Sequence, residues 1–213
     1  MTEPLQQVTK PPVTVEGSHA ETLTRIFQDE VNLAVWRRPE NPHWRPFTQA
    51  LIEQAGHFER FASVVPGEAV DGLLPDWARE LAGADLWLDD VNQLVEMFCC
   101  LFEPQAVGVR LHVVDRPLCP RFHTDRVPVR LLCTYSGPGT EWLPEHRVRR
   151  SGSGGPLPEQ VVDASDIQHI PAGAVALLKG EAWIGNEGRG IVHRSPCLNP
   201  EPRLMVGLDW LSD

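Results

Sequence analysis

The sequence predicts an α+β fold in which N-terminal helices pack on a C-terminal β-sandwich or jelly roll. One observation is the high content of turn-forming residues, with 17 glycines and 20 prolines in 213 residues, which favours many short strands. A second is charge: residues 1–110 hold 17 acidic and 8 basic side chains, whereas residues 111–213 hold 12 and 11. A third is the spacing of apolar residues, which is helical in the first half and strand-like in the second.

The helical half begins after residues 1–18, which we interpret as a flexible tail. Helices are expected over residues 19–31, 42–54, 75–81 and 85–102, with a strand over 32–36. The last helix has the clearest pattern, because its apolar residues recur at i, i+3, i+4, i+7 and i+11: Val91, Leu94, Val95, Phe98 and Phe102. Pro104 ends it.

Strands are expected over residues 107–114, 127–135, 174–179, 190–192 and 203–210, separated by clusters of Gly, Pro and Ser. No helical pattern alternates with them, which disfavours a parallel sheet. We therefore expect residues 19–213 to form a single domain, with 19–105 as helical support and 106–213 as a jelly-roll core.

Several classes of function are disfavoured. A net charge of −10 argues against a nucleic-acid partner. No apolar run approaches the roughly 18 residues of a membrane span, and the start lacks the pattern of a signal peptide, so we expect a cytoplasmic protein without a membrane partner. The five cysteines form no Cys-x-x-Cys pair, and no Gly-x-Ser-x-Gly motif is present.

The pattern that carries chemistry is His123-Thr124-Asp125. On an extended strand, residues i and i+2 point to the same face, so the imidazole and the carboxylate can converge. His193 follows 70 residues later. Two histidines and one carboxylate on one side of a metal form a facial triad that leaves positions open on Fe(II).

Arg203 follows His193 by ten residues, on a strand whose other face is apolar. Its guanidinium is therefore expected in a polar cavity, where it could bind a carboxylate with two hydrogen bonds. Simpler interpretations remain: His193 could be a core histidine, and Arg203 could pair with Asp209.

The pattern His-x-Asp, a distant His and then an Arg resembles that of the Fe(II)- and 2-oxoglutarate-dependent dioxygenases, over roughly residues 107–210. This resemblance implies a double-stranded β-helix, a cupin-like jelly roll. It implies that His123, Asp125 and His193 bind the iron and that Arg203 holds the far carboxylate of 2-oxoglutarate. The family usually has Ser or Thr two residues after the arginine, where this chain has Met205.

The chain also resembles a bacterial family named domain of unknown function 1826, from about residue 30 onward. The motifs that carry this resemblance are Pro-Arg-Phe-His-Thr-Asp (120–125), Arg-Leu-Leu-Cys-Thr-Tyr (130–135), Gly-Pro-Gly-Thr-Glu-Trp (137–142) and Leu-Lys-Gly (178–180). The family name implies no activity. Its members are thought to occur near zinc-responsive genes, which hints that metal supply matters.

Further candidates flank the predicted metal site. Tyr135 and Lys179 are expected to contact the co-substrate, and four residues are candidate walls of a substrate pocket: Arg130, Trp142, Trp183 and Arg194. If one strand runs unbroken from Phe122, Tyr135 shares the metal face and Arg130 points away, unless Pro128 marks a bulge.

Three functions follow from these observations. The first is an Fe(II)/2-oxoglutarate-dependent oxygenase that hydroxylates a small molecule or a protein side chain. The second is a cupin-like protein that binds Zn(II) without oxygen chemistry. The third is a non-catalytic interaction module. The sequence specifies neither the substrate nor the oligomeric state.

Overall fold

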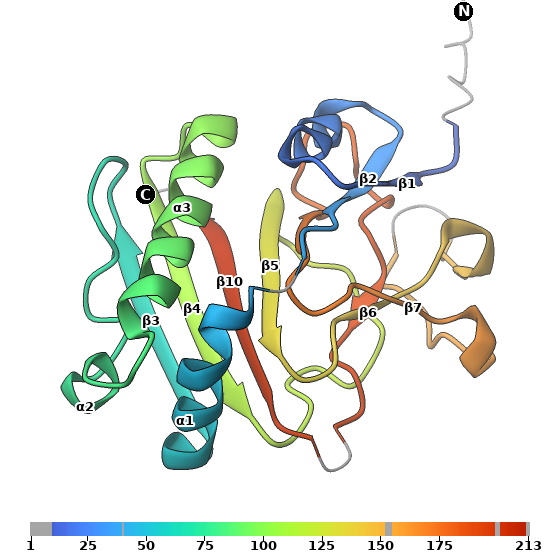
Figure 1. Cartoon of the computed structure of the whole chain (residues 1–213). Coiled ribbons are helices and arrows are strands. Elements are labelled where there is room, and N and C mark those ends of the chain that lie inside the picture. Colours follow the sequence, from blue (N-terminus) through green and yellow to red (C-terminus); the bar gives the residue numbers. More distant parts are fainter. Residues whose placement is uncertain (1–9, 40, 152–154, 199–200, 212–213) are drawn as a thin grey trace, which may run out of the picture.

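Two antiparallel-rich sheets form the framework of the protein in its computed structural model, which describes residues 10–39, 41–151, 155–198 and 201–211 (Figure 1). The large sheet has the strand order β1 (Val13–Gly17), β2 (Val31–Trp36), β8 (Val175–Lys179), β5 (Val129–Ser136), β10 (Arg203–Leu211), β4 (Ala106–Val114) and β3 (Phe58–Val64). The small sheet has the order β7 (Gln168–His169), β6 (Glu141–Trp142) and β9 (His193–Arg194).

Strand β10 lies near the middle of the large sheet, between β5 and β4, and is antiparallel to both. This register places Asp209 opposite Arg130 and Met205 opposite both Thr134 and His112. Only the β1–β2 pair of the large sheet is parallel among the described strands. The alternation of side chains along β10 therefore brings polar groups from three neighbouring strands onto one face.

The helices cover the other face of the large sheet (Figure 1). The α-helices are α1 (Arg45–Ala55), α2 (Asp76–Arg79) and α3 (Ala84–Phe102). Elsewhere the described chain also forms the 3₁₀ segments η1 (Ala20–Phe27), η2 (Pro42–Trp44), η3 (Glu145–Arg147) and η5 (Ala164–Asp166). The predicted apolar face of α3 is buried against the sheet, as its spacing requires: Val91, Leu94, Val95, Phe98 and Phe102.

Two separate clusters of buried side chains reflect the two faces of the sheet. The larger one joins the helices to the odd-numbered positions of β5, such as Leu131 and Cys133. The smaller one lies on the opposite face, between the large and small sheets, and contains Leu132, Trp142 and Met205. Folding therefore depends mainly on one face, which leaves the other free to hold polar groups.

Some expectations were wrong. Val13–Gly17 forms β1 rather than part of a flexible tail, while residues 1–9 lie outside the described residues. The first half contains two strands that were not expected, β1 and β3, beside β2, which matches the strand expected over residues 32–36. The helix expected over residues 19–31 is only the 3₁₀ segment η1. The predicted strand over residues 127–135 begins only at Val129, directly after Pro128, which cannot donate to a strand ladder. No helix among the described residues combines the length and apolar character that a bilayer crossing requires.

Candidate functional site

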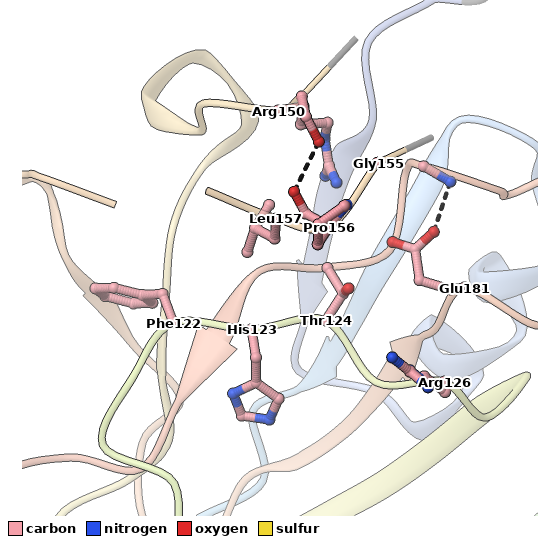
Figure 2. A pocket seen from close by; sticks show the side chains of 11 residues that line it. Phe122, His123, Thr124, Arg126, Arg150, Gly155, Pro156, Leu157 and Glu181 are labelled. Atoms are coloured by element: carbon pink, nitrogen blue, oxygen red, sulfur yellow. Dashed lines mark hydrogen bonds between the residues drawn. The ribbon is translucent and has the colours of Figure 1, made fainter. Parts of the chain in front are cut away.

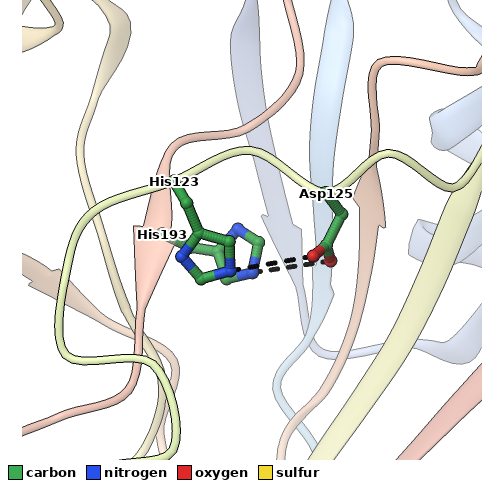
Figure 3. A group of neighbouring side chains, drawn as sticks. All are labelled: His123, Asp125 and His193. Carbon is green, nitrogen blue, oxygen red and sulfur yellow. Dashed lines mark ion pairs between the residues drawn. The ribbon is translucent and has the colours of Figure 1, made fainter. Parts of the chain in front are cut away.

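His123, Asp125 and His193 come together, and their ligand atoms all lie within 4.8 Å of one another (Figure 3). The backbones of the two histidines form an antiparallel bridge with two N–H···O contacts of 3.0 Å. His123 Nε2 lies 3.7 Å from Asp125 Oδ1, and His193 Nε2 lies 3.5 Å from Asp125 Oδ2. Two imidazoles and one carboxylate thus share one small space.

The hydrogen bonds of the two histidines suit a metal ion. Nδ1 of His123 lies 3.0 Å from the carbonyl of Arg121, and Nδ1 of His193 lies 3.2 Å from that of Ile191. Each ring can therefore carry its proton on Nδ1 and present the lone pair of Nε2 to the centre. Burial lowers the pKa of His193 to about 4, which keeps the imidazole neutral near pH 7. This donor set fits Fe(II) or Zn(II).

Asp125 lies in the segment that precedes β5, and backbone contacts hold that segment in place. Glu181 donates its N–H to the Asp125 carbonyl at 2.8 Å, and Gly180 donates to the Pro128 carbonyl at 2.8 Å. A Cβ atom at position 180 would lie 2.1 Å from the Val127 carbonyl oxygen. Glycine at this position is what lets the ligand-bearing segment pack directly on the end of β8.

A chain of charges runs from Asp125 across the sheet. Arg130 Nη1 lies 2.9 Å from both carboxylate oxygens of Asp125, and Arg130 Nε lies 2.6 Å from Asp209 Oδ1. Arg110 Nε lies 2.8 Å from the other Asp209 oxygen. Burial opposes the charge of Arg130, but Asp209 and Asp125 outweigh it and raise the pKa of Arg130. Asp209 therefore pairs with these two arginines and not with Arg203.

Arg203 is a buried charge that has no counter-ion among the described residues. Its side chain is buried, with 2% relative exposure, and it donates to the hydroxyls of Thr134 at 2.8 Å and Thr140 at 2.7 Å. No carboxylate of the described residues forms an ion pair with it. Burial lowers the pKa of Arg203 to about 10, so the guanidinium remains charged near pH 7. A buried cation with only hydroxyl partners is suited to bind an anion.

His123, His193 and Arg203 face the same cavity, which has a volume of about 310 Å³, and Asp125 lies next to the two imidazoles. Its wall also contains Arg110, His112, Arg130, Thr140, Arg194, Met205 and Gly207. A larger cavity of about 800 Å³ lies on the other side of the chain at His123. In Figure 2 the His123 imidazole points away from Thr124, Pro156 and Arg150, which line that larger cavity. The smaller cavity is therefore the one that offers access to the triad.

Tyr135 does not line this cavity, contrary to the prediction. Its ring packs between Trp44 and Trp87 on the helical side of the sheet, and its hydroxyl donates to Asp90 at 2.6 Å. The prediction failed because the segment before Val129 is not a strand, so the alternation did not carry through from His123. The same break turns Arg130 toward the triad, which is the outcome foreseen if Pro128 interrupted the register.

Lys179 and Trp183 also lie on the helical side. Lys179 Nζ donates to the Gln28 carbonyl at 3.0 Å and lies 4.5 Å from the centre of the Trp183 ring, which in turn contacts Phe27. Neither residue reaches the cavity. Lys179 was expected near the co-substrate and Trp183 near the substrate, and both expectations were wrong. For Lys179 the reason is the alternation of side chains along β8, which places Leu178 on the face toward the small sheet instead.

Of the two remaining candidates for the pocket wall, Arg194 lines the cavity and Trp142 does not. Arg194 lines the cavity, where its Nε lies 2.5 Å from Glu141 and its guanidinium stacks 4.3 Å from the centre of the Phe122 ring. Trp142 is buried between the two sheets and lines a separate cavity of about 410 Å³. It is therefore not a wall of the triad's cavity, although its backbone pairs with His193.

The sequence analysis did not identify several residues in and around the cavity, among them Thr134, Thr140 and His112. Thr134 and Thr140 hold Arg203, and His112 lines the cavity with a buried Nδ1 that has no hydrogen-bond partner. A signal for His112 existed, because β4 alternates apolar residues with Arg110 and His112. The threonines gave no such signal, since hydroxyl residues are common in strands and turns.

Solved structures with a similar fold include enzymes that use dioxygen. The crystal structure of a dioxygenase for auxin oxidation from rice matches with 13% identity and a TM-score of 0.54, over 95% of this chain and 83% of that one. The Arabidopsis thaliana dioxygenase for auxin oxidation 1, in complex with 2-oxoglutarate, matches with 14% identity and a TM-score of 0.45, over 96% of this chain and 93% of that one. A Pseudomonas putida prolyl-4-hydroxylase matches with 10% identity and a TM-score of 0.45, over 90% of this chain and 98% of that one. Of these three structures, the rice enzyme has a TM-score above 0.5 and supports the fold assignment.

No curated protein matches the chain. A family model does: it matches residues 17–209, a range that includes the triad and Arg203. The chain therefore belongs to the family described as "Protein of unknown function (DUF1826)".

Proposed function

We propose that this protein is a non-haem Fe(II)-dependent oxygenase that uses 2-oxoglutarate to hydroxylate an organic substrate. The observation that carries the proposal is the shared cavity, in which the two histidines of the His123–Asp125–His193 cluster face a buried arginine that forms no ion pair with a described carboxylate. Fe(II), when bound, supplies the chemistry that couples the decarboxylation of a 2-oxo acid to oxygen insertion into a C–H bond.

The residues of the chain have separate roles in this proposal. His123, Asp125 and His193 hold the iron from one side and leave the other side accessible from the cavity. Arg203 binds the distal carboxylate of 2-oxoglutarate, with its guanidinium oriented by Thr134. The burial of these groups excludes water and strengthens the charge pairing.

Met205 occupies the position of the hydroxyl residue that the dioxygenases usually have. The hydroxyls of Thr134 and Thr140 already contact Arg203, and they supply polar groups on this side of the cavity. His112, directly opposite Met205 on β4, is a further polar group in the same wall. These contacts support an acidic co-substrate despite the methionine.

The substrate that we propose is a small molecule or a protein side chain rather than nucleic acid, because the chain carries a net charge of −10. A cytoplasmic location is part of the same proposal.

Metal analysis of anaerobically purified protein tests the proposal, followed by measurement of succinate release with Fe(II) and 2-oxoglutarate. We expect one metal ion per chain and slow succinate release even without substrate. The His123→Ala variant should lose both. His19→Ala is the matched control, because His19 is exposed and does not line the cavity.

Two outcomes would replace the proposal. Stoichiometric zinc that iron cannot displace, without succinate release, would identify a zinc-binding protein instead. Absence of any bound metal, together with a thermal stability that the His123→Ala substitution leaves unchanged, would identify a non-catalytic module.

A further inference from the structure

Arg130 occupies a particular place on the carboxylate of Asp125. Its Nη1 lies 2.9 Å from both carboxylate oxygens, so it sits between them. A cation that was chelated by both oxygens would need this same position. A metal ion held by the two imidazoles can therefore reach the carboxylate only through one oxygen while Arg130 stays in place.

The position of Arg130 is itself fixed from behind. Asp209 is buried, with 4% relative exposure, and accepts from Arg130 Nε at 2.6 Å. Arg110 holds the second oxygen of Asp209 at 2.8 Å from the neighbouring strand. The guanidinium of Arg130 thus has one acid on each side, and neither can move without breaking a charged hydrogen bond.

We propose that Arg130 is a positioning residue that restricts Asp125 to a single bond to the metal and so keeps one more coordination position open in the cavity. A facial triad leaves three of six positions free only when its carboxylate binds through one oxygen. A 2-oxo acid that binds through two atoms, together with dioxygen, needs all three. This inference rests on the proposed function, because it requires a metal at the triad.

Mn(II) is a suitable probe, since the number of water molecules on the bound ion determines how strongly it relaxes water protons. In Arg130→Gln, Asp125 becomes free to chelate the ion. We expect the relaxation per bound Mn(II) to fall by about a third, because one of three water positions is lost. Mn(II) affinity should stay within about threefold of that of the unsubstituted protein or increase, while 2-oxoglutarate affinity falls about tenfold.

Two further variants separate positioning from a general structural effect. Asp209→Asn should shift the relaxation in the same direction, because it loosens Arg130 without touching the triad. Arg110→Gln is the matched control: it removes an arginine from the same cavity and from the other oxygen of Asp209, but it leaves both acids of Arg130, Asp125 and Asp209, in contact with that arginine, so the relaxation per bound ion should not change.

Unchanged relaxation per bound ion in Arg130→Gln would overturn the inference. The inference would also be overturned if Arg130→Gln lowered the affinities for Mn(II) and 2-oxoglutarate equally and Arg110→Gln did the same, because a general structural role of these arginines predicts that result. Failure of the unsubstituted protein to bind Mn(II) would refute the proposed function and this inference with it, whereas normal binding with no difference between variants refutes only the inference.

Discussion

Replacing Arg203 with methionine should stabilise the metal-free protein while abolishing its response to 2-oxoglutarate. The buried guanidinium has two hydroxyl partners and no counter-ion among the described residues, and burial lowers its pKa from the ordinary value of an arginine to about 10. At about 1.4 kcal/mol per pKa unit, the charge costs the folded state about 3 kcal/mol. Loss of the hydrogen bonds to Thr134 and Thr140 offsets about 1–2 kcal/mol of the gain.

The sign of this effect fixes its pH dependence. Below pH 10 the guanidinium is charged in both the folded and the unfolded chain, so the full cost is present at pH 7. The cost declines only above pH 10, where the folded state releases the proton first. A comparison near neutral pH therefore measures the whole effect.

Urea denaturation, followed by tryptophan fluorescence, provides the measurement. We expect Arg203→Met to be about 1–2 kcal/mol more stable than the unsubstituted protein without ligands. With Mn(II) and 2-oxoglutarate at 100 times its dissociation constant, the unsubstituted protein should gain about 2.7 kcal/mol and the variant none of the co-substrate's share. A metal-free variant destabilised by 2 kcal/mol or more would refute the reasoning, because the arginine would then be a net stabilising group.

Three further predictions concern groups outside this contact. Tyr135→Phe should lower the unfolding free energy by about 1 kcal/mol, because the hydrogen bond to Asp90 is lost, and it should leave 2-oxoglutarate affinity unchanged. A weaker 2-oxoglutarate affinity in calorimetry would contradict this prediction, because it would indicate that Tyr135 contacts the co-substrate. Burial lowers the pKa of Lys179 to about 8, so the unfolding free energy should rise with pH between 8 and 10.5, and Lys179→Met should remove that rise in pH-dependent denaturation. Gly180→Ala should weaken Mn(II) binding at least about tenfold, because its Cβ would displace the Val127 carbonyl; unaltered binding would mean that the segment carrying Asp125 relaxes freely.

The spacing of apolar residues was enough to predict the longest helix and the inner strands. The helix over residues 85–102 is α3, which begins one residue earlier, and the strand over residues 203–210 is β10. Both elements are long and strongly periodic, so their pattern outweighs local variation. By contrast, β3 was not predicted, because Phe58–Val64 lies at the edge of the sheet and is mostly exposed.

The three clustered side chains of the candidate site could be predicted from the sequence, but the residues that surround them could not. His123, Asp125 and His193 were identified from their chemistry and spacing, although the first two do not lie on a regular strand. The face on which Tyr135 lies depended on where the strand begins, and one break in the register reverses every later residue. The neighbours of Arg203 could not be inferred either, since they depend on which strands lie side by side.

The backbone bridge between His123 and His193 has a consequence for how the proposed metal ion would be acquired. Main-chain hydrogen bonds join the backbones of two of the three proposed ligands. Loading would then be a bimolecular encounter with a folded receptor, and its rate is expected to follow the water-exchange rate of the incoming ion. Occupancy would be set by the ions that the cell supplies, and one ion could be exchanged for another long after synthesis of the chain.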